Sequence, residues 1–328
     1  MRNIQRVLVT GASGKLGHPL CKALLENGYH VFGMSRRHPV ELAGVEEVRA
    51  DVADRLAVEE IVARSDAVIH LARGKDSREA VIDVSARGTL NILDAAMRTQ
   101  MPQRVILASG DAVNGIYYCP QSAQIDEEMP MRAYPGYYAL SKVIEETMFR
   151  QYFVQAGVPT IICRMSWIHA EDDILSHLTI AGEGFGVPEW NELMDANLQD
   201  QYIDGHDAVV SLRHPNGSPL VRQIVAVEDC VQALLLALQC DGIEGETFQI
   251  AMAEPFSYAA AAEYAASQLG IEVLELFDPV GHDFRINITK ARSRLGYKPR
   301  YDIGRLIDHA VEHRRSGRVR RPRIGAKG

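Results

Sequence analysis

The sequence lacks any hydrophobic run long enough to cross a membrane. Its longest apolar stretch covers residues 231–238, far short of the ~20 residues that a transmembrane helix requires. The chain starts with Met-Arg-Asn-Ile and passes directly into a strand-like segment, without the pattern of a signal peptide. We therefore expect a cytoplasmic protein that makes no contact with a membrane.

The sequence also has few cysteines and no net positive charge. The five cysteines are scattered and show no Cys-x-x-Cys or Cys/His ligand spacing, which predicts reduced thiols and no metal site. The formal net charge of −8 argues against a protein that binds nucleic acid. Arginines nevertheless crowd the C-terminal end, and the basic tail 316–328 is either a solvated end or a segment that binds anions or a partner.

Strand-like and helix-like segments alternate through the first half of the 328 residues. With 47% hydrophobic residues, the chain can bury a sizeable core and form two unequal lobes. Short apolar runs occupy 7–10, 29–34, 48–51, 67–72 and 104–109, and amphipathic helical patterns occupy 55–63 and 77–99. This order predicts an α/β fold with a doubly wound parallel sheet, which binds ligands at the carboxyl ends of its strands.

The first strand, Val7–Thr10, is followed at once by a glycine-rich turn that opens a helix. The turn has the spacing Gly-x-x-Gly-x-x-Gly, which lets the backbone approach a pyrophosphate while the unpaired N–H groups of the helix face it. A turn of this kind between a strand and a helix predicts a dinucleotide site. The predicted contacts are Gly11, Ser13, Gly14, Lys15, Leu16 and Gly17.

The second strand ends in Ser35, Arg36 and Arg37, where an NAD site usually carries an acidic residue. Two guanidinium groups without a competing carboxylate would bind a 2′-phosphate, so NADP is favoured, with NAD as the other possibility. The alternative interpretation is two solvated arginines at a strand end. Further cofactor contacts are predicted at the next strand ends, from Asp51 and Val52 and from Leu71, Ala72 and Arg73.

Tyr138 and Lys142 lie four residues apart in a segment that predicts a helix, so they share one helical face. A phenol has an ordinary pKa near ~10 and transfers protons poorly at neutral pH unless a cation favours its phenolate. The ammonium of Lys142 can be that cation. The pair alone is a weak signal, and it gains weight from the nucleotide site upstream.

Taken together, these motifs resemble the extended short-chain dehydrogenase/reductases, the NAD-dependent epimerase/dehydratase family, which also includes uronate dehydrogenases. The resemblance covers nearly the whole chain. It rests on the glycine turn, Asp51, 70–72, Val113-x-Gly115, Tyr138-x-x-Ser141-Lys142, Arg164, 227–229 and 295–299. It implies a Rossmann domain over 1–165, to which 225–251 return, and a smaller, sequence-discontinuous α/β substrate lobe over 166–224 and 252–315.

By this resemblance Tyr138 is the general acid/base and Lys142 binds the nicotinamide ribose, with Met165 beside the cofactor. The family's Ser or Thr before Val-x-Gly is missing, because Gly110 occupies that position. Ser109 could replace it only if the strand end is rotated or bulged, since neighbouring side chains of a strand face opposite ways. Asp111 matches an acid of the dehydratase branch, but that branch follows the acid with Glu and Ala112 follows here, so sugar dehydration is disfavoured.

The second half of the sequence says less about function. Residues 167–222 are rich in Gly, Pro, Asp and Asn with little periodicity, which is typical of a loop-rich cover over a pocket. Trp167 and Asp111 are predicted to contact the substrate, although Trp167 and the neighbouring His169, His177, Trp190 and Arg222 could each be structural.

The family commonly forms homodimers through the helix that carries Tyr138 and the 77–99 helix, so a homodimer is expected.

The sequence therefore predicts an NADP-dependent oxidoreductase or epimerase that acts on a hydroxyl/carbonyl pair of a sugar-like or nucleotide-sugar-like molecule. The alternative is a nucleotide-binding protein with weak or no turnover. Gly110 and Ser85, which replace residues usual in the family, motivate that alternative.

Overall fold

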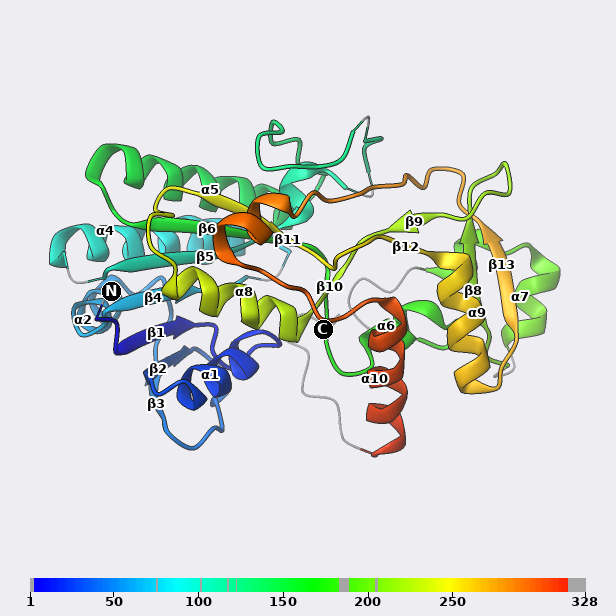
Figure 1. Cartoon of the computed structure of the whole chain (residues 1–328), viewed down its shortest axis with the longest axis horizontal. Coiled ribbons are helices and arrows are strands. Elements are labelled where there is room, and N and C mark those ends of the chain that lie inside the picture. The colour runs from blue at the N-terminus through cyan, green and yellow to red at the C-terminus, as the bar shows by residue number, and fades with distance from the viewer. Residues whose placement is uncertain are drawn as a thin grey trace.

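A seven-stranded parallel sheet forms the larger part of the molecule (Figure 1). The computed structural model describes residues 3–74, 76–100, 102–116, 118–121, 123–182, 189–203 and 206–317. The strand order is β11-β6-β5-β4-β1-β2-β3, so the chain builds outward in both directions from β1. The strands are β1 Arg6–Thr10, β2 His30–Ser35, β3 Val45–Arg49, β4 Ala67–His70, β5 Arg104–Gly110, β6 Thr160–Met165 and β11 Thr247–Ile250. The predicted fold class is confirmed.

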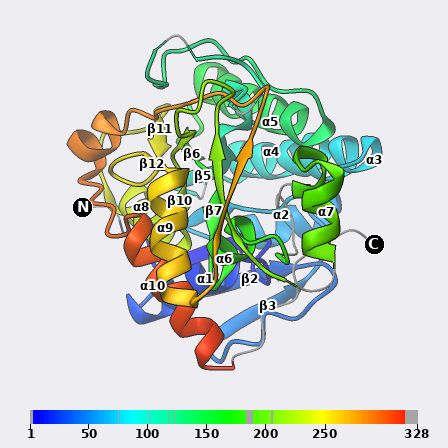
Figure 2. The same cartoon turned by 90° about the vertical axis from the view of Figure 1, so that its right-hand side faces the viewer.

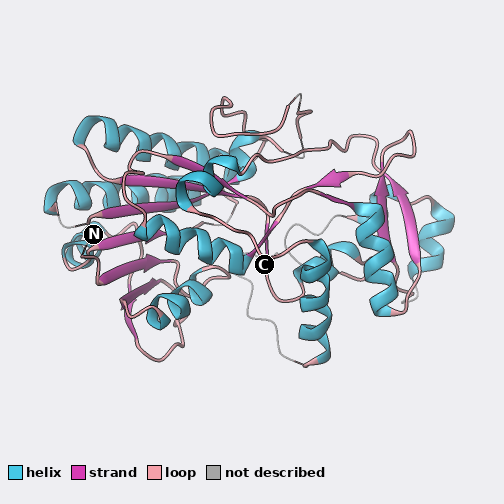
Figure 3. Cartoon of the chain, in the orientation of Figure 1, coloured by secondary structure: helices cyan, strands magenta, loops and turns pink. Residues whose placement is uncertain are grey.

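Helices cover both faces of this sheet, as Figure 3 shows. Alternate residues of each strand face opposite sides, so Val7 and Val9 pack in one core with α1 and α8, whereas Leu8 packs in another with α2, α4 and α5. The bounds of these helices are α1 Gly17–Glu26, α2 Arg55–Ala63, α4 Thr89–Thr99, α5 Tyr137–Ala156 and α8 Val227–Gln239. The sheet is thus buried on both sides, and its ligand-binding edge is the end at which the strands finish.

The helix predicted over 77–99 is a continuous run of three segments with two kinds of turn. It begins as α3 (Arg78–Ala80), widens into the π-helical segment η1 (Val81–Gly88) and continues as α4. Gly88 is the last residue of the widened segment. A side chain at this position would be crowded, because a Cβ would lie 2.5 Å from Cγ2 of Val52. This close approach brings the helix down onto the loop after β3, where the adenosine contacts are predicted.

A second lobe has its own hydrophobic core and lies beside the strand ends (Figures 1 and 2). The core joins residues of 174–226 to residues of 252–311. The lobe contains α6 Asp173–Leu178, η3 Trp190–Leu193, α7 Ala196–Ile203, β8 Val209–Arg213, β9 Val221–Arg222, β12 Phe256–Ser257, α9 Tyr258–Leu269, β13 Val273–Phe277 and α10 Ile303–Arg315. The segment expected to be loop-rich therefore holds short helices and strands, and these are too short to produce a clear sequence period.

Two short strands lie between the two lobes. β7 (Ile168–His169) pairs in parallel with β10 (Val225–Ala226), just after β6 and just before α8. Farther on, η4 (Ala291–Leu295) packs against α8 and β11. No helix in the described ranges is long and apolar enough to cross a bilayer. The basic tail lies almost wholly outside the described residues, which end at Gly317.

Candidate active site

The glycine-rich turn lies at the carboxyl ends of β1 and β4 and requires its glycines. Gly11 has a φ of +69°, and a Cβ on it would lie 3.0 Å from the backbone nitrogen of Ala72. A Cβ on Gly17 would lie 2.2 Å from the carbonyl oxygen of Gly11. The turn therefore holds the first residues of α1 directly against the strand end, with the helix N-terminus facing the ligand edge of the sheet.

A buried threonine that sequence reasoning missed supports this turn from below. The hydroxyl oxygen of Thr10 accepts hydrogen bonds from the backbone nitrogens of Leu71 and Ala72, each at 3.1 Å, and lies 2.8 Å from Nδ1 of His70. Burial lowers the pKa of His70 to about 3, with a further contribution from the ammonium of Lys142. A neutral imidazole and a threonine hydroxyl thus fix the two strand ends at which cofactor contacts are predicted.

The predicted adenosine end contains an ion pair. Nη1 of Arg36 lies 2.7 Å from Oδ2 of Asp51, whose Oδ1 accepts a hydrogen bond from the backbone nitrogen of Ala53. Burial opposes the ionisation of Asp51, but this hydrogen bond and the two guanidinium groups of Arg36 and Arg37 outweigh it, so the pKa of Asp51 is lowered. A 2′-phosphate at this strand end would compete with Asp51 for Arg36. The Ser35 hydroxyl donates to the carbonyl oxygen of His38 at 2.7 Å.

Lys15 connects the glycine turn to the second lobe. Its ammonium lies 2.7 Å from Oδ2 of Asp173 on α6 and 3.4 Å from the carbonyl oxygen of Ile168 on β7. The lysine is half-exposed, whereas the carboxylate of Asp173 is mostly buried. The turn predicted to bind a pyrophosphate therefore carries a cation that already has a carboxylate partner in the other lobe.

Tyr138 and Lys142 come together on the first two turns of α5. The backbone nitrogen of Tyr138 donates to Oδ1 of Asp76 at 2.8 Å, which caps the start of the helix. The ammonium of Lys142 lies 6.0 Å from the centre of the Tyr138 ring, and the guanidinium of Arg73 lies 5.0 Å from that centre. Two cations thus flank one phenol, and the helix geometry expected from the four-residue spacing is present.

The ammonium of Lys142 is buried and held in place. It donates to Oε2 of Glu145 at 2.8 Å and to the carbonyl oxygen of Ala108 at 3.2 Å, and the side chain of Lys142 is only 5% exposed. Burial lowers the pKa of Lys142, but the carboxylate of Glu145 and the phenol of Tyr138 outweigh burial, so the net pKa is raised. The lysine is therefore a permanent cation beside the phenol at neutral pH.

The end of β5 shows which residue faces the phenol. A Cβ on Gly110 would lie 3.0 Å from the hydroxyl oxygen of Tyr138. The hydroxyl of Ser109 instead donates to Oε1 of Glu146 at 2.6 Å, in a buried network with Arg164. The register of β5 with β6 continues unbroken to the last residue of both strands, so the bulge that would turn Ser109 toward the phenol is absent from this strand pair.

The direction of the Ser109 side chain thus disfavours its predicted role as a substitute hydroxyl beside Tyr138. The physical reason is the alternation of a regular strand, which directs residues 109 and 110 to opposite faces. Among the residues described, the position that could hold an oxyanion donor against Tyr138 is occupied by a glycine.

Asp111 follows Gly110 and is buried beside the start of the second lobe. Its Oδ2 lies 3.0 Å from the hydroxyl oxygen of Ser166, and that hydroxyl also donates to the carbonyl oxygen of Gln223 at 2.6 Å. Burial raises the pKa of Asp111 to about 7. Because a carbonyl can only accept and a hydroxyl has one hydrogen, the short bond to Gln223 favours a proton on Asp111.

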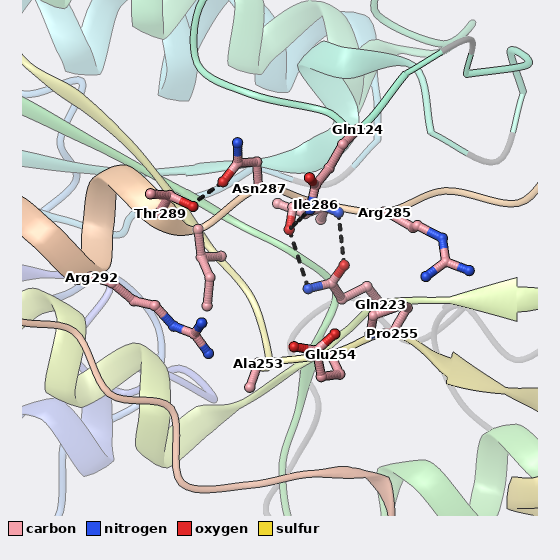
Figure 4. Close-up of a pocket in the computed structure, with 11 residues that line it drawn as sticks. Gln124, Gln223, Ala253, Glu254, Pro255, Arg285, Ile286, Asn287, Thr289 and Arg292 are labelled. Carbon is pink, nitrogen blue, oxygen red and sulfur yellow. Dashed lines mark hydrogen bonds between the residues drawn. The ribbon is translucent and has the colours of Figure 1, made fainter.

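Gln223 continues this network into the segment that follows β13. Its amide donates to the carbonyl oxygens of Met252 and Ile286 and accepts from the backbone nitrogen of Ile286 at 2.7 Å (Figure 4). The hollow beside it, of about 140 Å³, is also lined by Arg285 and Arg292. Strand β5, the start of the second lobe and segment 285–289 are thereby joined through one buried chain of polar groups.

The remaining predicted residues lie near the ends of β4 and β6. Met165 ends β6 and is buried, and Leu71 and Ala72 lie directly under the turn. Trp167 lies in a cluster of rings, 4.7 Å from His169 and 4.5 Å from His177 between ring centres. The described ranges hold no group of three or more His, Cys, Asp or Glu side chains arranged to bind a metal.

Comparison with known proteins gives a family for this geometry. The model of the NAD dependent epimerase/dehydratase family matches residues 7–251. A dTDP-glucose 4,6-dehydratase of Streptomyces niveus is 25% identical over 96% of this chain and 94% of its own length. A uronate dehydrogenase of Pseudomonas putida is 32% identical, over 49% of this chain and 60% of its own length.

Solved structures agree on the fold. A short-chain dehydrogenase/reductase superfamily protein from Agrobacterium tumefaciens with bound NAD has a TM-score of 0.84 and 24% identity, covering 95% of this chain and 98% of that one. UDP-glucuronic acid 4-epimerase from Bacillus cereus in complex with NAD has a TM-score of 0.73 and 19% identity, covering 94% and 96%. Because the family model spans about three quarters of the sequence, the chain belongs to the NAD dependent epimerase/dehydratase family and is an enzyme of the extended short-chain dehydrogenase type, as the sequence predicted.

Proposed function

We propose that this protein is an oxidoreductase or epimerase that uses NADP, or NAD as the second choice, on a hydroxyl/carbonyl pair of a sugar-like or nucleotide-sugar-like molecule. The observation that carries the proposal is the ring of Tyr138 with two cations close to it, Lys142 and Arg73, at the same sheet edge as the glycine turn. A bound nicotinamide ring would supply hydride transfer at its C4 atom.

The protein's own groups move the proton. The phenol oxygen of Tyr138 would take the proton of a substrate hydroxyl during oxidation and return it during reduction. Lys142 would stabilise negative charge on that oxygen, because Glu145 and the carbonyl of Ala108 hold its ammonium in place. By the resemblance to the family, the same ammonium would bind the nicotinamide ribose.

The relatives support the choice of substrate class. Among them are a sugar-nucleotide dehydratase, a uronate dehydrogenase and an L-arabinose 1-dehydrogenase of Haloferax volcanii that uses NAD(P). The 2′-phosphate preference is supported by Arg36 and Arg37 at the end of β2, where no acidic side chain follows the strand, but Asp51 would have to release Arg36 to such a phosphate. Reduction or oxidation of uronic acids, aldoses and nucleotide sugars, followed by nicotinamide absorbance with both cofactors, tests this proposal.

The variant Tyr138→Phe tests the role of the phenol. It keeps the ring between its two cations and removes only the oxygen, so we expect kcat to fall by at least about 10²-fold with little change in the Kd of the cofactor. Unchanged turnover of every accepted substrate would exclude Tyr138 as the acid/base.

The second candidate is a nucleotide-binding protein with weak or no turnover. Gly110 favours it, because loss of one oxyanion donor typically costs about 10²–10³-fold in rate. Fluorescence titration with NADPH and NADH separates the two candidates: this second one predicts tight cofactor binding and no product in the substrate screen.

We also propose a cytoplasmic homodimer that pairs α4 and α5 with their copies. Leu90 and Met97 lie seven residues apart on α4, Leu140 and Val154 lie fourteen apart on α5, and all four are exposed hydrophobic side chains. These spacings place each pair on one helix face. Light scattering on the wild type and on a Leu140→Asp, Val154→Asp variant would give the mass of a dimer and of a monomer, respectively.

A further inference from the structure

A cavity of about 380 Å³ lies beside α5, the helix that carries Tyr138 and Lys142, at the edge of the sheet formed by β11. Its walls come from α5, the ends of β6 and β11, the segment 127–131 and Lys290 before η4. Small-molecule sites in proteins typically occupy about 300–1,000 Å³, so the cavity is large enough for a small metabolite. The lining contains none of the residues assigned above to the cofactor or to catalysis.

Three buried donor atoms on residues that line this cavity have no hydrogen-bond partner within the described part of the chain. They are Nη1 of Arg164, Nε of Arg150 and the hydroxyl of Thr247. Arg164 is 1% exposed and Thr247 is 4% exposed, so solvent does not replace the missing acceptors. An unsatisfied buried donor costs about 1–3 kcal/mol, more when it is charged, which makes three such donors around one cavity an unusual concentration.

The two guanidinium groups, rather than the net charge of the lining, favour an anion, because the lining carries three basic and three acidic side chains. Both guanidinium groups share a single carboxylate, because Glu146 accepts from Arg164 at 2.8 Å and from Arg150 at 3.3 Å. Glu127, Glu128 and Glu246 also line the cavity. Oε1 of Glu127 already accepts from the backbone nitrogen of Gln249, and Glu246 already pairs with Lys290 at 2.6 Å.

From these contacts we propose that the cavity is a binding site for a small oxyanion, either a carboxylate or a phosphate group of a metabolite. Nη1 of Arg164, the Nε–H of Arg150 and the Thr247 hydroxyl would donate to its oxygens, and charge-assisted bonds from the two guanidinium groups are the strong ones. The site is separate from the proposed reaction and needs no turnover to be detected.

Glu146 does not line the cavity, but it connects the two arginines of the lining to the end of β5. Glu146, which holds both guanidinium groups, accepts the hydroxyl of Ser109 at 2.6 Å, and Ser109 precedes the Gly110 that faces the phenol. A ligand that binds to the two arginines would therefore contact a buried network, through Glu146 and Ser109, that ends at the candidate active site.

Binding is tested on the full chain by isothermal titration calorimetry with inorganic phosphate and with malonate, against sodium chloride of equal ionic strength. Both titrations are done with saturating NADPH, because the glycine turn is itself expected to bind phosphate. We expect one saturable site, with a lower Kd for phosphate if the natural ligand is a phosphate ester and for malonate if it is a carboxylate.

The variants isolate the cavity from the rest of the protein. Thr247→Val removes one donor that makes no internal hydrogen bond, and Arg150→Gln removes a charge, so each is expected to raise the Kd of the preferred probe roughly tenfold or more. Arg55→Gln, a matched change on exposed α2, should leave it unchanged. Absence of saturable binding of both probes, or equal Kd values for the wild type, Thr247→Val and Arg150→Gln, would overturn the proposal.

Discussion

Replacement of Gly110 by serine should restore the hydroxyl that the active site lacks. The backbone at Gly110 has φ −140° and ψ 162°, in the extended region that any residue adopts, so serine adds no backbone strain. Its Cβ would lie 3.0 Å from the oxygen of Tyr138, a tight contact that the ring can relieve by a shift of a few tenths of an ångström. The hydroxyl would then lie beside the phenol, where a substrate oxygen is expected.

The expected gain follows from the value of one preorganised donor. Such a donor contributes about 10²–10³-fold to kcat, equivalent to roughly 3–4 kcal/mol of transition-state stabilisation. We expect kcat of Gly110→Ser, measured by nicotinamide absorbance at saturating cofactor, to rise toward the lower end of this range, because the new side chain is not held by the surrounding shell.

Gly110→Ala is the matched control, since it brings the same Cβ and no hydroxyl. Equal kcat values for the serine and alanine variants would refute the reasoning, because only the contact with the ring would then matter. A serine variant slower than the wild type would show that Gly110 makes room for the substrate.

Three further predictions concern charges in the site. Glu145→Gln removes the carboxylate of a buried ion pair and should lower the free energy of unfolding by about 3–5 kcal/mol, measured by urea denaturation; a loss below 1 kcal/mol would mean that Lys142 finds another partner. Asp111 binds a proton more tightly when folded, so its ionisation opposes folding increasingly as pH rises from ~4 to about 7; Asp111→Asn should therefore raise Tm relative to the wild type more at pH 8 than at pH 4, and an equal difference at both would contradict the raised pKa. Arg36→Gln should weaken NADPH binding roughly tenfold and NADH binding far less in fluorescence titrations, whereas equal losses would assign Arg36 to holding Asp51 alone.

The parts that the sequence predicted are those set by local geometry. The glycine turn follows from three residues whose Cβ atoms would collide with backbone atoms, and the Tyr138–Lys142 pair follows from the helical repeat. Both depend on residues within a few positions of each other. The parallel, doubly wound class of the sheet follows in the same way, because strands and helices alternate with clear periods.

The parts that sequence reasoning missed depend on residues far apart in the chain. Thr10 and His70 are 60 positions apart, and Lys15 and Asp173 are 158 apart, so no pattern of spacing indicates either contact. Glu145 lies close to Lys142 in sequence, but its burial appears only after α5 packs against β5 and β6. The direction of Ser109 required the register of β5, which only the folded sheet supplies.

The contact of Lys15 with Asp173 and Ile168 has a consequence for how the two halves of the molecule communicate. The ammonium of Lys15 lies beside the expected nucleotide site and also binds Asp173 on α6, the first helix of the second lobe. A relative movement of the halves that separated these groups by about 1 Å would break this contact, and the glycine turn would keep only its bonds within the larger lobe. We therefore expect nucleotide binding at the glycine turn and movement of the second lobe to influence each other through the side chain of Lys15.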